Sequence, residues 1–281
     1  MILVFGQSGQ VGRELQVLDN IVTLSRNEAD LSNPTSCENI IRKHNPEAVI
    51  NAAAYTDVDL AEKEEALATI INGNAPISMA KVCAEISIPF VHISTDYVFD
   101  GMGDEPWKPN HPTNPQNAYG RSKLVGEKGI ISSGANYAIL RCPWIISANG
   151  KNFIKTMLNL SKNKDKLSIV SDQIGAPTPA SDVANACYKI ALELCNNSDK
   201  SGIYHFSGMP FVSWYDFAKE IFFQVKQNVD LTPILSVDYN STAKRPLNSR
   251  LECSDIQRQF GINLPYWKKN LKTILKELGE R

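Results

Sequence analysis

The sequence predicts an α/β fold: a doubly wound, parallel sheet followed by a smaller mixed part. Three observations indicate it. Short apolar runs alternate with longer helical patterns through the first half of the chain, which is typical of βαβ units. A glycine-rich loop directly follows the first run, and the alternation gives way to mixed elements after Trp144.

The elements of the first half follow from their periodicity. Two segments, Leu60–Ile71 and Ala75–Ile86, carry apolar residues at three- and four-residue spacing, which predicts helices with one buried face. Gly101–Pro115 is punctuated by Pro and Gly and predicts an active-site loop. The predicted strands are Ile2–Phe5, Ile21–Leu24, Ala48–Asn51, Phe90–Ser94 and Tyr137–Arg141.

The second half predicts a mixture of elements whose loops could cover a substrate. The strands expected there are Leu167–Val170 and Ile203–Ser207. The helices expected there are Phe153–Lys162, Ala180–Leu194, Trp214–Val225 and Trp267–Leu278.

Composition excludes several classes of function. The 281 residues include 29 basic and 30 acidic ones, giving a net charge of -1, so we expect no nucleic-acid partner and no anionic membrane surface. The N-terminal apolar run is too short for a signal peptide or a membrane span. Six cysteines and four histidines are scattered without metal-ligand spacing. We therefore expect a cytoplasmic protein with reduced cysteines and no bound metal.

The glycine-rich loop predicts a Rossmann-type dinucleotide site. Gly6, Gly9 and Gly12 are spaced three apart, with Gln10 and Val11 between the last two, and helical residues Arg13–Leu18 follow. Such glycines let the backbone approach a pyrophosphate at a helix N-terminus. We assign residues 1–145 mainly to dinucleotide binding and 146–281 mainly to substrate binding, with some later segments returning to the first part.

Other cofactor contacts are expected where further strands end. Ser25-Arg26 closes the second strand, where an acidic residue would bind the 2′-hydroxyl of NAD and an arginine would accommodate the 2′-phosphate of NADP. This favours NADPH, with NADH possible. Asp30-Leu31 and Ala54-Tyr55-Thr56 lie just beyond strands, where adenine and the riboses would pass.

Two Tyr-x-x-x-Lys pairs occur, and each places both residues one turn apart on a helix face. Tyr215 and Lys219 lie within an apolar helical stripe, which favours a packed aromatic beside a solvated lysine. Tyr119 and Lys123 follow the Pro-rich loop and open a helix. Reduction of a ketone needs a proton donor, and an ammonium near a phenol favours its ionised form. We predict that Tyr119 is the acid and that Lys123 adjusts the pKa of its phenol. Thr95 is predicted to form a hydrogen bond with the carbonyl oxygen of the substrate ketone.

Together these segments resemble the dTDP-4-dehydrorhamnose reductases of the extended short-chain dehydrogenase/reductase superfamily. The resemblance spans nearly the whole chain. It is carried by Gly6–Gly12, Asn51–Thr56, Ser94–Phe99, the Tyr119-Gly120-x-x-Lys123 motif, Gln173–Thr178 and Arg245–Leu251.

The resemblance implies NAD(P)H-dependent reduction of the C4 ketone of dTDP-4-dehydro-L-rhamnose, a step in cell-surface polysaccharide synthesis. It implies that Tyr119 donates the proton, that Thr95 and Asp96 contact the sugar, and that Lys123 binds the nicotinamide ribose. Trp144 would flank the sugar.

The resemblance also bears on assembly. Relatives that pair through magnesium use clustered carboxylates. Glu14 fits that pattern, but Ser181 stands where a glutamate is expected. We therefore expect no metal, and either a monomer or a homodimer.

One neighbouring function is disfavoured and two others stay open. A nucleotide-sugar 4,6-dehydratase would need an Asp-Glu pair, whereas Tyr97 follows Asp96. A reductase of UDP-linked 4-keto deoxysugars would share every catalytic residue. A non-catalytic regulatory subunit could bind a dinucleotide without needing Tyr119 or Lys123, and the presence of both favours an enzyme.

Overall fold

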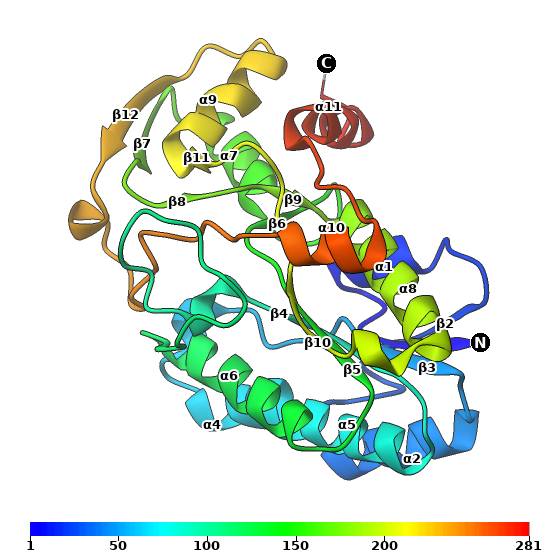
Figure 1. Ribbon diagram of the computed structural model, residues 1–281. Coiled ribbons are helices and arrows are strands. Elements are labelled where there is room, and N and C mark those ends of the chain that lie inside the picture. Colours follow the sequence, from blue (N-terminus) through cyan, green and yellow to red (C-terminus); the bar gives the residue numbers. More distant parts are fainter. Residues whose placement is uncertain (281) are drawn as a thin grey trace.

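The computed structural model describes residues 1–280. A parallel six-stranded sheet in the order β10-β5-β4-β3-β1-β2 crosses the lower part of the molecule in Figure 1. Its strands are β1 (Ile2–Phe5), β2 (Ile21–Leu24), β3 (Ala48–Asn51), β4 (Phe90–Ser94), β5 (Tyr137–Arg141) and β10 (Gly202–His205). The strand order reverses between β1 and β3. In doubly wound sheets, ligands bind outside the carboxyl ends of the strands at such a reversal.

Helices cover both faces of this sheet, which confirms the predicted fold class (Figure 1). One face is covered by α1 (Gln10–Leu15), α8 (Ala180–Asn196) and α10 (Ser254–Phe260). The other is covered by α2 (Pro34–His44), α5 (Ala75–Glu85) and α6 (Ala118–Ile131), with the short α4 (Glu65–Thr69) against α6. Because every residue of β1 and β3 is buried, these strands read as continuous apolar runs in the sequence.

A smaller lobe lies above the sheet in Figure 1 and has its own hydrophobic core, which includes Phe217 and Trp267. Its helices are α7 (Phe153–Ser161), α9 (Trp214–Gln224) and α11 (Trp267–Glu277). Its strand pairs are β6 (Ile145–Ile146) with β9 (Thr178–Pro179), β7 (Lys166–Val170) with β12 (Asp230–Ile234), and β8 (Ile174–Gly175) with β11 (Val212–Ser213). Single-turn helices η2 (Asp96–Val98), η3 (Ser198–Lys200) and η4 (Ser236–Asp238) lie in the connections.

The helix expected over Leu60–Ile71 is wrong as a single element. The segment forms α3 (Val58–Ala61), α4 and the π-helix η1 (Ile70–Asn74). Asn72 gives a reason for the irregular turn: its side chain is buried, bonds both backbone groups of Tyr55, and donates to Ser122 of α6. Tertiary contacts here override local periodicity.

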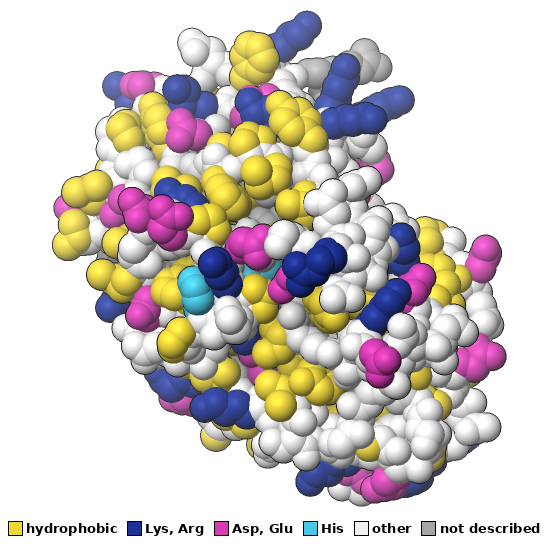
Figure 2. All heavy atoms as spheres, in the orientation of Figure 1, with side chains coloured by type: hydrophobic (Ala, Val, Ile, Leu, Met, Phe, Trp, Pro, Cys, Tyr) yellow, Lys and Arg dark blue, Asp and Glu magenta, His cyan; other side chains and the backbone are white. Residues whose placement is uncertain are grey.

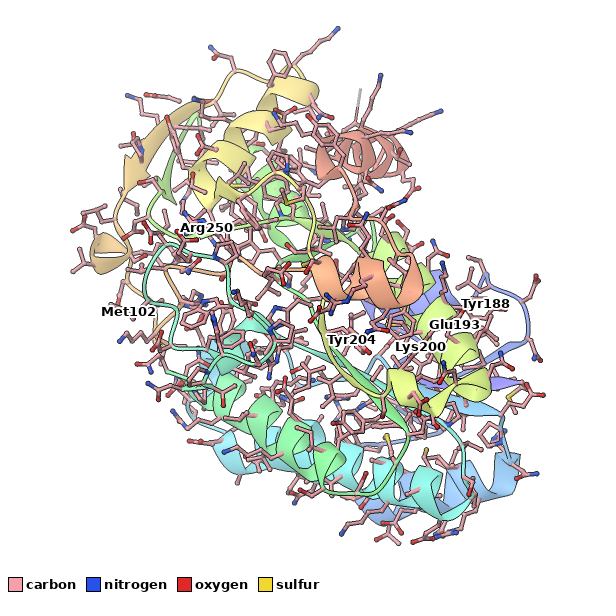
Figure 3. All side chains as sticks on the ribbon, viewed as in Figure 1. Met102, Tyr188, Glu193, Lys200, Tyr204 and Arg250 are labelled. Carbon is pink, nitrogen blue, oxygen red and sulfur yellow. The ribbon has the colours of Figure 1, made fainter. Side chains whose placement is uncertain are left out.

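The last strand of the sheet is tied to α8 beside it. Lys200 of η3 forms an ion pair with Glu193 at 2.7 Å, and the Tyr204 hydroxyl of β10 donates to the Lys200 carbonyl at 2.7 Å. These residues gather at the end of α8 in Figure 3. Pairing with β5 places β10 in the sheet of the first part of the fold, and these contacts attach it to the end of α8.

The surface in Figure 2 mixes basic and acidic side chains over one face of the molecule. No helix within residues 1–280 combines the length and the apolar character that crossing a bilayer requires.

Candidate active site

Helix α6 presents three polar residues, Tyr119, Lys123 and Glu127, at four-residue spacing toward β4. Asn117 caps the helix by accepting from the Gly120 N–H at 2.8 Å. A Cβ atom at Gly120 would lie 2.3 Å from the Tyr97 carbonyl oxygen. Glycine is therefore required for α6 to approach the segment after β4 this closely.

Tyr119 is half-buried, with its ring edge-on to Tyr97 at a centroid distance of 5.5 Å. Desolvation raises the pKa of its phenol above the ordinary value. A hydrogen bond with Thr95 acts in the opposite direction, and the charge of Asp96 adds to the rise. The phenol is therefore a protonated donor at neutral pH, held beside Thr95.

Thr95 and Asp96 follow β4 directly and are 4% and 2% exposed. The Thr95 hydroxyl donates to Asp96 Oδ1 at 3.2 Å, whereas Asp96 Oδ2 is buried and has no partner in the described part of the chain. Desolvation raises the pKa of Asp96 to about 6, although the neighbouring Ser249 hydroxyl acts to lower it. A buried acceptor without a partner is costly, and a sugar hydroxyl would supply the missing donor.

Lys123 is 1% exposed. Its Nζ lies 2.6 Å from the Ile93 carbonyl oxygen and 3.0 Å from His92 Nε2, so the ammonium is directed at β4 and not at the Tyr119 hydroxyl. Burial lowers the pKa of Lys123 to about 8. The influence of Lys123 on the pKa of Tyr119 stays a prediction, because contact between the two groups needs a different Lys123 rotamer or a bridging group.

Glu127 holds the end of β4 in place. It accepts from Ser94 Oγ at 2.5 Å and from Arg141 at 2.9 and 2.6 Å, and both Glu127 and Arg141 are buried. Breaking such a buried pair from one side costs about 3–5 kcal/mol. This pair, which sequence reasoning missed, fixes the strand that carries Thr95.

Trp144 lies three residues after β5 and adopts a left-handed backbone, with φ of 38°. Its ring stacks on Trp214 of α9, with centroids 3.5 Å and planes 15° apart. A Cβ atom at Gly175 would lie 2.8 Å from the indole of Trp144. Cys142, at the end of β5, donates its N–H to the Ser94 carbonyl at 3.3 Å, so Trp144 is near the same sheet edge as Thr95.

The glycine loop forms a cradle at the reversal between β1 and β3. A Cβ atom at Gly6, where φ is 104°, would lie 2.7 Å from the Ala53 nitrogen, and one at Gly12 would lie 1.9 Å from the Gly6 oxygen. Gly9 precedes α1 and no side chain caps that helix. The loop therefore leaves close-approaching backbone at the position where a dinucleotide pyrophosphate would lie.

Gln10 and Val11 face away from this cradle. Val11 is buried in the core. The Gln10 carboxamide donates to the Ile145 carbonyl at 3.4 Å and accepts from Ser147 and Asn152 at 3.2 and 3.0 Å. Only the backbone of these two residues is left for a cofactor, while the Gln10 side chain joins the loop to the upper lobe.

The turn after β2 contains a feature that sequence reasoning missed. Both the backbone N–H and the hydroxyl of Ser25 donate to Glu28 Oε2, at 2.8 and 2.6 Å. The Arg26 side chain is 75% exposed and lies 3.8 Å from Asp30, whereas Leu31 is buried. A carboxylate thus occupies the donors that a 2′-phosphate would use, and the Ser-x-x-Glu spacing could have indicated it.

The third predicted cofactor segment follows β3. Ala54 and Tyr55 are half-buried and Thr56 is exposed. Asn72 accepts from the Tyr55 N–H at 2.8 Å, which fixes this loop against α6.

The structure thus brings Tyr119, Thr95 and Asp96 together, with Lys123 behind them. The second Tyr-x-x-x-Lys pair lies on α9 in the upper lobe, where Lys219 Nζ lies 5.4 Å from the Tyr215 ring centroid. Residues 1–280 contain no group of three or more His, Cys, Asp or Glu side chains arranged to hold a metal ion.

Comparison with known proteins shows the family. Residues 1–280 match the model of the RmlD substrate binding domain. A dTDP-4-dehydrorhamnose reductase of Aggregatibacter actinomycetemcomitans is 41% identical, with 97% of both chains covered, and one of Burkholderia thailandensis is 39% identical over 99% of this chain and 98% of that protein.

Solved structures agree. The reductase of Clostridium acetobutylicum superposes with a TM-score of 0.92 at 35% identity, over 99% of both chains. That of Bacillus anthracis, solved with NADP, superposes with a TM-score of 0.90 at 33% identity, over 98% of both chains. The chain belongs to the RmlD substrate binding domain family, which groups it with the dTDP-4-dehydrorhamnose reductases.

Proposed function

We propose that the protein is an NAD(P)H-dependent reductase that converts the C4 ketone of dTDP-4-dehydro-L-rhamnose into the hydroxyl of dTDP-L-rhamnose. The observation that carries the proposal is the meeting of Tyr119, Thr95 and Asp96 at the carboxyl end of β4. The nearby cradle of Gly6 and Gly12 fits a dinucleotide. The curated relatives with this name support the substrate.

The residues divide the chemistry among them. The bound cofactor supplies a hydride to the carbonyl carbon. Tyr119 gives its phenolic proton to the carbonyl oxygen, and the Thr95 hydroxyl, turned from Asp96 toward the sugar, donates a hydrogen bond to that oxygen. The free Asp96 Oδ2 accepts from a sugar hydroxyl, and Trp144 flanks the ring. The cofactor would be held by the backbone of the glycine loop, by Lys123, and by the segments after β2 and β3.

The proposal extends to cellular setting. A net charge of -1 and the mixed charges in Figure 2 favour a small nucleotide-sugar substrate over nucleic acid. We propose that the enzyme works in the cytoplasm, as a monomer or homodimer, in the synthesis of a cell-surface polysaccharide.

Consumption of NADPH, followed by its absorbance, tests the proposal with a panel of dTDP- and UDP-linked 4-keto deoxysugars. We expect the highest kcat/KM with dTDP-4-dehydro-L-rhamnose. A higher value with a UDP-linked sugar would transfer the function to that substrate class. Absence of oxidation with every sugar, in a protein that binds NADPH, would indicate a regulatory subunit instead.

A further inference from the structure

A buried histidine stands behind Lys123 and takes no part in the chemistry described above. His92 lies in the middle of β4, is fully buried, and stacks on Phe90 at a centroid distance of 6.1 Å. Burial, and secondarily the charge of Lys123, holds the pKa of His92 well below its ordinary value. The imidazole is therefore neutral near pH 7, and a neutral ring carries one N–H proton.

Asn51 determines which ring nitrogen is the better acceptor. Its Oδ1 accepts from the Ala53 N–H at 3.1 Å, which turns its Nδ2 toward His92 Nδ1 at 3.2 Å. The opposite amide orientation would place NH₂ against the Ala53 N–H, so the backbone fixes the assignment. An NH₂ group beside Nδ1 donates to it, and the single ring proton then belongs on Nε2.

The other end of this chain of hydrogen bonds is Lys123, whose Nζ lies 3.0 Å from His92 Nε2. If Nε2 carries the proton, Nζ must accept and is an amine. If Nζ is an ammonium, Nε2 must accept, the ring proton moves to Nδ1, and the bond from Asn51 is lost. The protonation of Lys123 and the tautomer of His92 therefore depend on each other.

We propose that His92, oriented by Asn51, is a positioning residue for Lys123: it holds Nζ against β4 and couples the protonation of the lysine to the tautomer of the imidazole. The proposal rests on the proposed reduction. Tyr119 gives its proton to the sugar oxygen, and a proton from solvent restores the phenol. Lys123 gains or loses its own proton to solvent. When Nζ is an amine it accepts from Nε2–H, in the tautomer that Asn51 favours, and the ring reaches that tautomer by losing its Nδ1 proton to solvent and gaining one on Nε2.

The other groups around Nζ are consistent with this role. Burial lowers the pKa of Lys123 to about 8, and Glu127 on its own helix and Cys142 after β5 act in the opposite direction. The lysine is thus near the point of deprotonation at the pH of the cell. A small change in its hydrogen bonding should move the alkaline limb of the pH profile.

Two substitutions should move this limb in opposite directions. In Asn51→Asp, a carboxylate accepts from Nδ1–H and leaves Nε2 free to accept from the ammonium. The pH at which kcat declines on the alkaline side should therefore increase by about one unit. In His92→Phe, which keeps the ring, the ammonium loses its acceptor. The pH of the alkaline decline should decrease by about one unit, and kcat at its maximum should fall about tenfold or more. His92→Gln, which retains a donor and an acceptor, should restore part of that turnover.

His205→Phe is the matched control. His205 is a buried histidine of β10 whose ring contacts the Trp107 carbonyl at 3.0 Å and Arg141 at 3.4 Å. Its replacement tests the cost of losing a buried imidazole without touching Lys123. It should leave the position of the limb unchanged. Thermal unfolding of each variant identifies any that do not fold.

The affinity for NADPH, measured by calorimetry without sugar between about pH 6 and 9.5, gives a second readout. The affinity should decline with rising pH, and the midpoint of this decline should be higher than in wild type for Asn51→Asp and lower for His92→Phe. The role of His92 would be overturned if this pH were unchanged in both variants, or if it shifted in the same direction in both. If the wild type reduced no sugar, the proposed function would fail, while this binding measurement would still decide the inference.

Discussion

The carboxyl ends of β4 and β2, to which we assign the chemistry and the choice of cofactor, differ in their exposure to solvent. After β4, Thr95, Asp96 and Lys123 are at most 4% exposed, and each makes contacts that leave little freedom. After β2, the Arg26 side chain is 75% exposed and its nearest acidic partner lies 3.8 Å away. Buried interactions are strong and specific, whereas solvent and salt screen exposed ones. The chemistry should therefore tolerate almost no change, while cofactor choice should be easily altered.

The largest effect is expected at the buried end. Tyr119→Phe removes the proton donor but keeps the ring that meets Tyr97 edge-on. Turnover should fall by roughly two to four orders of magnitude, the usual worth of a positioned general acid. Steady-state kinetics measure the loss, and calorimetric titration with NADPH serves as the control, because affinity should stay within about threefold. Near-wild-type turnover would remove Tyr119 from the mechanism.

A second substitution sharpens the comparison through stability. Because desolvation raises the pKa of Asp96 to about 6, the folded state binds this proton more tightly than the unfolded state. Ionisation of this buried carboxyl therefore lowers the free energy of unfolding as pH rises from about 4 to 6. The loss of stability persists at higher pH. Asp96→Asn removes the charge. The variant should be more stable than wild type by about 1–3 kcal/mol at pH 8, and the difference should vanish near pH 4.

Urea unfolding of the two proteins at several pH values measures this difference. The same variant should lose about tenfold or more in kcat/KM, since it replaces the acceptor of a sugar hydroxyl. A variant that is less stable at pH 8 would show that Asp96 has a structural role instead.

The smallest effects belong to the exposed turn after β2. Arg26→Ala should lower the ratio of kcat/KM with NADPH to that with NADH by about tenfold, and Ser25→Asp should reverse the preference. Glu28→Gln should raise the ratio by about threefold to tenfold, because the Ser25 donors that Glu28 now occupies become free for a 2′-phosphate. The effects of all three substitutions on this ratio should be smaller at high salt. An unchanged ratio in both Arg26→Ala and Glu28→Gln would place cofactor choice elsewhere.

Five of the six strands of the sheet could be predicted to the residue, because parallel strands are buried on both faces and appear as short apolar runs. The sixth, predicted as Ile203–Ser207, is Gly202–His205. The predicted Ile2–Phe5 and Tyr137–Arg141, for example, are β1 and β5. The helix over Leu60–Ile71 was wrong because Asn72 is committed to Tyr55 and Ser122, contacts made between elements distant in sequence. Periodicity carries no information about such contacts.

The site shows the same division. Tyr119 and Lys123 could be proposed from their four-residue spacing, and Thr95 from its position at the end of a strand, because both signals are local in the sequence. Glu127 of α6 meets Arg141 of β5, and His92 of β4 meets Asn51 of β3, only once the chain has folded. Their sole signal in the sequence was a polar residue within an apolar run, as in the strand that contains His92.

The central claim, a simple reduction in which a hydride from the cofactor reaches C4 of the sugar, is tested most directly by following hydrogen isotopes. The substrate is reduced once with NADPH deuterated at both nicotinamide C4 positions, and once with ordinary NADPH in D₂O. The product should carry one deuterium on sugar C4 in the first experiment and none on any carbon in the second. Deuterium at C3 or C5 from D₂O, or none transferred from the cofactor, would contradict the claim and indicate chemistry through an enolised sugar.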